Sequence, residues 1–257
     1  MTDIVVASPS VEPITLAQAK LHIRETTAAQ DALLPTYISA ARAYAENFCT
    51  RALVLAKRRL LLDCFPSQID ILWTPLRAVQ SIRYVDDAGV LQTLAADQYR
   101  VDKQSLPARI TPAYEVTWPS TRAVTHAVRV DYTVGHLIPF TADAATDTLT
   151  AEGHGFEDTD QTMVATLAGS LPGGLSPSTN YHVRDAAANT LKLAATAGGA
   201  AIDITENGTA PNVLGSLHRD IELALYVLVQ YFEGREANEK ILRAAEMILG
   251  AHRVVRF

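Results

Sequence analysis

The sequence has little charge, few cysteines and no long apolar run. Only 19% of its 257 residues are charged, and the apolar run near its end, from Leu223 to Val229, covers seven residues. A membrane-spanning helix needs about 20 apolar residues, so none is expected. Two cysteines cannot form a disulfide framework, which favours a reducing compartment. The first residues lack a basic region followed by an apolar stretch, so we expect no secretory signal.

What the sequence does have is apolar residues, 48% of the total, enough for a substantial core. The net charge of −6 is unevenly distributed. Residues 139–216 contain nine acidic and two basic side chains, which gives −7, whereas the other 19 acidic and 20 basic side chains give +1. The acidity is therefore local, which indicates that residues 139–216 are a separate unit.

Apolar periodicity predicts an α+β fold. Residues spaced by three and four predict helices over about 15–24, 31–48, 220–233 and 237–249. Alternating residues and turn motifs predict short strands between 58 and 134 that form a small antiparallel sheet. We therefore expect one domain made of residues 1–138 and 217–257. Within the 220–233 helix, apolar residues occupy nearly every side, which favours burial by its own core and by a neighbouring subunit.

Residues 139–216 have no helical periodicity and are rich in alanine, threonine, glycine and aspartate. They predict an inserted all-β domain. Its expected strands are Thr148–Ala151, Gln161–Leu167, Tyr181–Arg184, Thr190–Leu193 and Ile202–Thr205.

Motifs that carry chemistry are weak in this sequence. It contains no phosphate-binding glycine loop and no nucleophile elbow. Glu152 and His154, with His182 further along, come closest to a metal-ligand set, but they are better explained as polar turn residues. We expect no catalytic residue, no metal and no cofactor. Cys49 and Cys64 are expected to be small buried hydrophobes.

A basic cluster, Lys57-Arg58-Arg59, precedes a predicted strand. It allows two interpretations. The cluster could contact phosphate or an acidic partner, or it could be a solvated beginning of a strand, which is the commoner case.

Several short stretches match those of a known protein family in their order and spacing: Glu12 to Lys20, Ala40 to Glu46, Arg51 to Leu53, Leu62 to Pro66, Ser81 to Asp86, Tyr99 to Asp102, Pro107 to Ile110, Trp118 to Arg122, Val128 to Gly135 and Leu228 to Glu236. In these stretches the chain resembles the gp6-like head-tail connector (adaptor) proteins of tailed phages. Residues 139–216 depart from the family pattern. They resemble a small module of other phage structural proteins.

The resemblance implies a structural protein of the virion neck with no enzymatic reaction, assembled in the host cytoplasm. Family members form rings, commonly of twelve subunits, which bind the portal protein and the next tail or neck protein. DNA passes through the central channel without sequence specificity, and no membrane is involved. The candidate subunit-interface residues are Tyr37, Tyr44, Tyr226, Val227 and Tyr231. The candidate portal-docking tail is Arg253, Val254, Val255, Arg256 and Phe257.

Two alternatives stay open at this point. One is a tail-completion or decoration protein. The other is a carbohydrate-binding protein or hydrolase that acts through the β insert, where Asp158, Asp160 and Asp185 could bind calcium or sugar.

Overall fold

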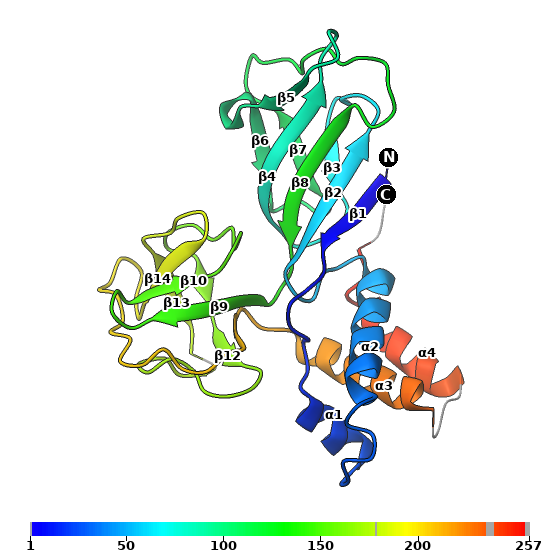
Figure 1. Cartoon of the computed structure of the whole chain (residues 1–257), viewed down its shortest axis with the longest axis vertical. Helices are drawn as coiled ribbons and strands as arrows, with labels where there is room; N and C mark the ends of the chain where they lie inside the picture. The colour runs from blue at the N-terminus through cyan, green and yellow to red at the C-terminus, as the bar shows by residue number, and fades with distance from the viewer. Residues whose placement is uncertain (1, 178, 235–238, 255–257) are drawn as a thin grey trace.

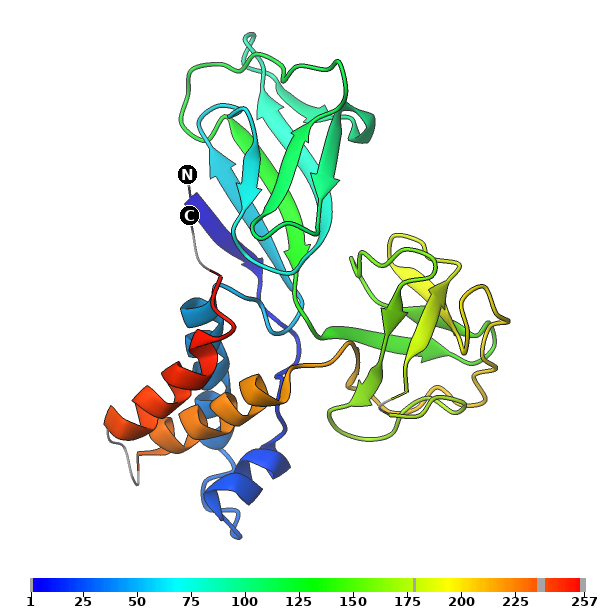
Figure 2. The same cartoon turned by 180° about the vertical axis from the view of Figure 1, so that it is seen from behind.

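The computed structural model describes residues 2–177, 179–234 and 239–254, which fold into a helical part, a β-sandwich and a β module (Figure 1). The sandwich and the helical part lie at opposite ends of the long axis. The β module projects from the side at the level between them (Figure 2). None of the described helices is long and apolar enough to cross a membrane.

The helical part consists of α1 (Leu16–Ile23), α2 (Leu34–Cys49), α3 (Arg219–Glu233) and α4 (Glu239–Gly250). Thr15 caps α1 and forms a capping box with Gln18, and Gly234 ends α3 in the left-handed conformation that glycine adopts most easily. The predicted beginning of the second helix was wrong. This helix begins at Leu34 rather than at 31, because Pro35 suits only the first turn of a helix.

The β-sandwich contains β1 (Thr2–Ala7), β2 (Ala56–Leu62), β3 (Ile69–Ile71), β4 (Leu76–Val85), β5 (Leu91–Leu94), β6 (Tyr99–Asp102), β7 (Ala108–Pro112) and β8 (Val128–Val134), with a short 3₁₀ turn at Ala96–Gln98. One sheet has the order β1-β2-β8-β4-β5 and the other β3-β7-β6, all antiparallel. The sequence predicted one small sheet, whereas the structure has two sheets packed face to face, and β1 was not predicted. Residues such as Leu60, Val130 and Tyr132 fill a core between the two sheets, separate from the helical core.

The β module contains β9 (Ile138–Asp143), β10 (Thr148–Thr150), β11 (Gln161–Thr162), β12 (Val164–Thr166), β13 (Tyr181–Arg184), β14 (Thr190–Ala194) and β15 (Asn212–Leu214). They form a sheet in the order β11-β13-β14-β10-β9-β15-β12 around a core of its own. The strand predicted at Ile202–Thr205 was wrong. That segment buries Ile204 but forms no ladder, whereas β9 and β15, which pair with each other, were not predicted.

The loop of residues 151–160 fastens the β module to the sandwich. Thr133 of β8 donates from Oγ1 to the carbonyl of Gly153 at 2.9 Å. Lys103 donates from Nζ to the carbonyl of Gly155 and to Glu157, both at 3.2 Å. The module is therefore held by this loop as well as by the chain connections at β9 and β15.

Candidate functional site

The tyrosines predicted to contact a neighbouring subunit pack first within their own chain. Tyr44 of α2 stacks on Phe48 with ring centroids 6.4 Å apart and meets Phe232 of α3 edge-on at 6.3 Å. Its hydroxyl donates to a carboxylate oxygen of Glu246 on α4 at 2.5 Å. Burial and, after it, this carboxylate raise the pKa of Tyr44 to about 12. Tyr44 therefore joins α2 to both C-terminal helices.

The remaining members of the predicted interface lie on the same helical part. Tyr226 of α3 stacks on His22 of α1 with centroids 5.4 Å apart, and Tyr231 packs edge-on against the next residue of α3 at 5.5 Å. Tyr37 and Val227 are half-buried against the helical core. All five predicted residues thus lie on α2 and α3 and are half-buried.

Four further apolar side chains of the helical part are exposed: Leu21, Leu33, Leu223 and Met247. Leu223 belongs to the helix that was predicted to be apolar on nearly every side, but the others were missed. The exposure of Met247 could have been predicted, because Met247 lies one turn after the exposed Arg243, on the polar side of an amphipathic helix.

The predicted portal-docking tail is described only in its first two residues, since Val255, Arg256 and Phe257 lie outside the described residues. The backbone amide of Val254 donates to the carbonyl of Cys49 at 3.0 Å. Arg253 lies with its guanidinium 5.6 Å from the ring centroid of Phe48 and is otherwise exposed. The segment after α4 is thereby attached to the end of α2.

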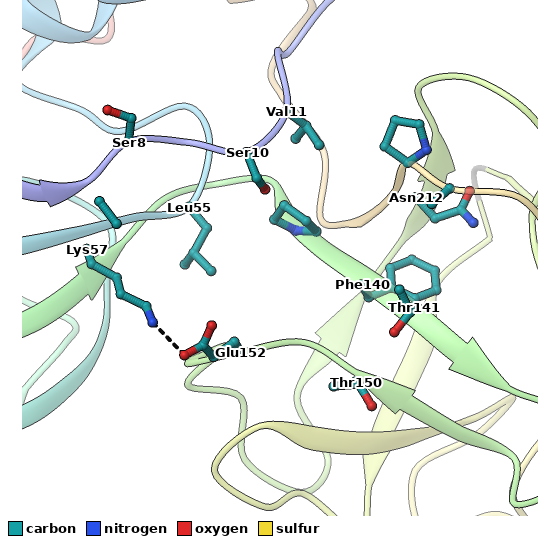
Figure 3. A pocket seen from close by; sticks show the side chains of 14 residues that line it. Ser8, Ser10, Val11, Leu55, Lys57, Phe140, Thr141, Thr150, Glu152 and Asn212 are labelled. Atoms are coloured by element: carbon teal, nitrogen blue, oxygen red, sulfur yellow. Dashed lines mark hydrogen bonds and ion pairs between the residues drawn. The ribbon is translucent and has the colours of Figure 1, made fainter.

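A groove of about 570 Å³ lies where the segment after β1 passes the β module (Figure 3). Val11, Leu55 and Phe140 give it an apolar lining, while Lys57 and Glu152 form an ion pair of 2.5 Å at one side. The lining pairs its one lysine with its one carboxylate, so it offers an apolar surface with little free charge. Sequence reasoning missed it because the lining comes from segments far apart in the chain.

The basic cluster 57–59 is neutralised within the chain. Lys57 pairs with Glu152, Arg58 with Asp3 at 2.9 Å and Arg59 with Asp131 at 2.5 Å. Arg58 is also buried, with its guanidinium 3.7 Å above the ring of Trp73. The interpretation of a solvated strand beginning was therefore wrong, because intramolecular acids occupy these cations.

Polar residues of the β module that suggested a ligand site have structural partners instead. Asp158 accepts a hydrogen bond from the amide of Ala186, and Asp160 accepts one from the amide of Glu157. His154 is buried, and its Nδ1 accepts from a backbone amide two residues on. Burial lowers the pKa of His154.

Asp185 forms an ion pair with its chain neighbour Arg184 at 3.3 Å. Of the cysteines, Cys49 is buried as predicted, whereas Cys64 is exposed. The prediction for Cys64 was wrong, because Cys64 lies in the bend two residues after β2 ends, where its side chain is exposed.

Comparison with known proteins agrees with the resemblance. Residues 13–85, which hold α1, α2 and β2 to β4, match the family model of the phage gp6-like head-tail connector protein. This part of the chain is therefore similar to the gp6-like connectors. No curated protein matches it.

Solved structures show a likeness of fold that covers the whole chain. Chains in "Neck of empty GTA particle computed with C6 symmetry", "Virion of native gene transfer agent (GTA) particle" and "Neck of native GTA particle computed with C12 symmetry" align with TM-scores of 0.59, 0.58 and 0.55. Each is 18% identical, and each alignment covers 100% of this chain and 97% of the other. The fold likeness therefore includes the β module.

Proposed function

We propose that the chain is a structural subunit of the neck of a tailed-phage-like particle, with no catalytic step. The match of residues 13–85 to the gp6-like connectors carries this proposal. The fold likeness to chains of gene transfer agent necks supports it. The proposed location of the protein is therefore the virion neck, with assembly in the host cytoplasm.

The proposed assembly is a homo-oligomeric ring of twelve subunits. A neck structure with the same fold was computed with C12 symmetry, which supports this number. A closed ring uses two different surfaces of each subunit, head to tail. The exposed sides of Tyr37, Tyr44, Tyr226, Val227 and Tyr231 form one candidate surface. Leu223 and Met247 extend it.

The proposed partners are the portal protein on one side and the next tail or neck protein on the other, with DNA in the central channel. Passage of DNA without sequence specificity requires few strong phosphate contacts, since each one makes binding tight and dependent on salt. The paired state of Lys57, Arg58 and Arg59 supports this, because acids of the same chain already neutralise them.

The proposal predicts a ring that forms or is stabilised on the portal. The full chain is mixed with purified portal protein and examined by native mass spectrometry and negative-stain microscopy. A twelve-subunit ring stacked on the portal is the expected result. A chain that stays monomeric and unbound in the presence of portal contradicts the proposal.

Truncation after Val254 tests the docking tail. It keeps the described contacts of Arg253 and Val254 and removes only residues 255–257. The expected result is an unchanged melting temperature with at least tenfold weaker portal binding, a change of about 1.4 kcal/mol. Portal binding equal to that of the full chain would show that residues 255–257 do not dock to the portal, but it would not contradict the proposed ring.

A further inference from the structure

Three metal-ligating side chains meet at the junction between the helical part and the segment after α4. His218 is the N-cap of α3, Asp220 lies in its first turn, and His252 follows the end of α4. One ligand atom from each lies within 4.8 Å of the others. Among the described residues, no other three histidine, cysteine or acidic side chains come together in this way.

The two distances from Asp220 to the histidines are close to those of a small divalent cation site. Zn²⁺ binds nitrogen and oxygen ligands at about 2.0–2.2 Å, so two ligand atoms of a tetrahedral site are about 3.3 Å apart. Asp220 Oδ2 lies 3.2 Å from His218 Nδ1 and 3.8 Å from His252 Nε2. A shift of a few tenths of an ångström in the His252 ring brings the second distance into this range.

The side chains are also available as ligands. His252 Nε2 is buried and makes no hydrogen bond within the described chain, and at 3.8 Å the Asp220 oxygen is too distant for one. His218 Nδ1 accepts a long hydrogen bond, 3.4 Å, from the amide of Asp220, so a metal ion bound at this nitrogen would have to displace that capping contact.

The backbone holds His252 in place before any cation arrives. Its carbonyl accepts from Arg51 Nε at 2.6 Å, and its amide donates to the carbonyl of Leu249 at 2.9 Å. The rings of His252 and His218 are 4.9 Å apart. Such preorganisation lowers the entropy cost of assembling a site.

We propose that His218, Asp220 and His252 bind a divalent transition metal ion of the zinc type. Two imidazoles and one carboxylate are ligands that Zn²⁺ takes, and a fourth position facing solvent would hold water. The ion would cross-link the beginning of α3 to the segment after α4. It would thus fasten the chain next to Arg253 and Val254, independently of whether the protein forms a neck ring.

One local effect opposes the ion. The N-terminal end of α3 carries a partial positive charge, and Arg51 is close by. The carboxylate of Asp220, together with Glu222 in the same turn, offsets it. We therefore expect affinity in the micromolar range, not the tighter binding of a site made entirely of buried thiolates.

The test uses the full chain, freed of metal with a chelator and studied without portal protein. Calorimetry with Zn²⁺ should give one ion per chain, and Co²⁺ should give the visible absorption of a low-symmetry site. Zn²⁺ should also raise the melting temperature, because an ion that binds only the folded state stabilises it.

Three variants, His218→Gln, Asp220→Asn and His252→Gln, should each weaken Zn²⁺ binding at least tenfold. The matched control is His182→Gln, a half-buried histidine of β13 outside the cluster, which should bind Zn²⁺ as the original chain does. Melting curves in chelator verify that each variant folds. No Zn²⁺ binding by the original chain at micromolar concentrations, or equal binding by folded variants and control, overturns the proposal.

Discussion

His136 is a half-buried histidine in the short segment between β8 and β9. Arg77 donates to its carbonyl at 3.2 Å and to that of Gly135 at 2.6 Å. Burial and, after it, the charges of Arg77, Arg51 and His252 lower the pKa of His136 to about 4. A histidine is thereby kept neutral beside an arginine at the connection between two β structures.

This arrangement predicts a loss of stability in mild acid. The unfolded chain takes up a proton near pH 6.5 and the folded chain only near pH 4, so stability present above about 6.5 is lost as the pH falls toward 4. A difference of that size corresponds to about 3 kcal/mol. In His136→Gln this part of the pH dependence should be absent in urea denaturation at about pH 7 and about pH 4.5.

The control for this prediction is His182→Gln, which removes a histidine from the β module and should leave the pH dependence as it is. If His136→Gln and the original chain lose stability in parallel as the pH falls, burial of His136 is not the cause.

At the residue scale, the sequence predicted which residues are buried better than it predicted which charged side chains pair. Apolar context correctly indicated that Cys49 is buried. The partners of Arg58 and Arg59, in contrast, come from β1 and β8, and the register of a sheet decides which acid faces which cation. Local sequence holds no signal for that register.

The loop of residues 151–160 is the element that joins two β structures. A side chain on Gly155 would bring a Cβ within 2.1 Å of the carbonyl oxygen of Arg77, and Gly155 has a φ of +65°. Gly198 has a similar φ of +69°, but nothing lies within 4 Å of an added Cβ. Comparing substitutions at these two glycines therefore separates the cost of a left-handed backbone from the cost of the steric contact with Arg77.

We expect Gly198→Ala to cost about 1–2 kcal/mol through strain of the left-handed backbone. Gly155→Ala should cost about 2 kcal/mol more, since the carbonyl of Arg77 must move away. Hydrogen exchange should show loss of protection around residues 151–160 in Gly155→Ala only. Equal destabilisation by the two variants would falsify the idea that the close contact between Gly155 and Arg77 holds the β module against the sandwich.

Elements with their own local signals were predicted, and elements that depend on pairing were not. α1 and α3 have caps and apolar periodicity, and both were found. Ile202 to Thr205 alternates like a strand, but it has no strand partner apart from an isolated bridge at Ala201. The His218 and His252 cluster was beyond sequence reasoning, because it is the packing of α4 against α3 that brings the beginning of α3 close to the segment after α4.

At the scale of the whole molecule, exposed apolar residues occur both on the helical part and on the sandwich that carries β5. Leu223 on α3 is 47% exposed, and Leu91 on β5 is 46% exposed. The helical part and β5 lie at opposite ends of the long axis (Figure 1). Equal exposure at the two ends gives a matched test of which end contacts a neighbouring subunit.

Leu223→Asp should reduce assembly on the portal at least tenfold, a change of about 1.4 kcal/mol. Its effect on the stability of the monomer should stay within about 0.5 kcal/mol, because the side chain is exposed. Leu91→Asp should assemble normally. Native mass spectrometry with portal measures both, and normal assembly of Leu223→Asp would show that the ring uses another surface.

The pairing of β9 with β15 has a mechanical consequence. The chain enters the β module at Ile138 and leaves it at Leu214, and these two residues face each other in the ladder. A force that pulls the module outward therefore acts on both strands from the same end and opens their ladder one pair at a time, like a zipper. Resistance to such a force rests on the loop of residues 151–160, which bears the load before the first pair of the ladder separates.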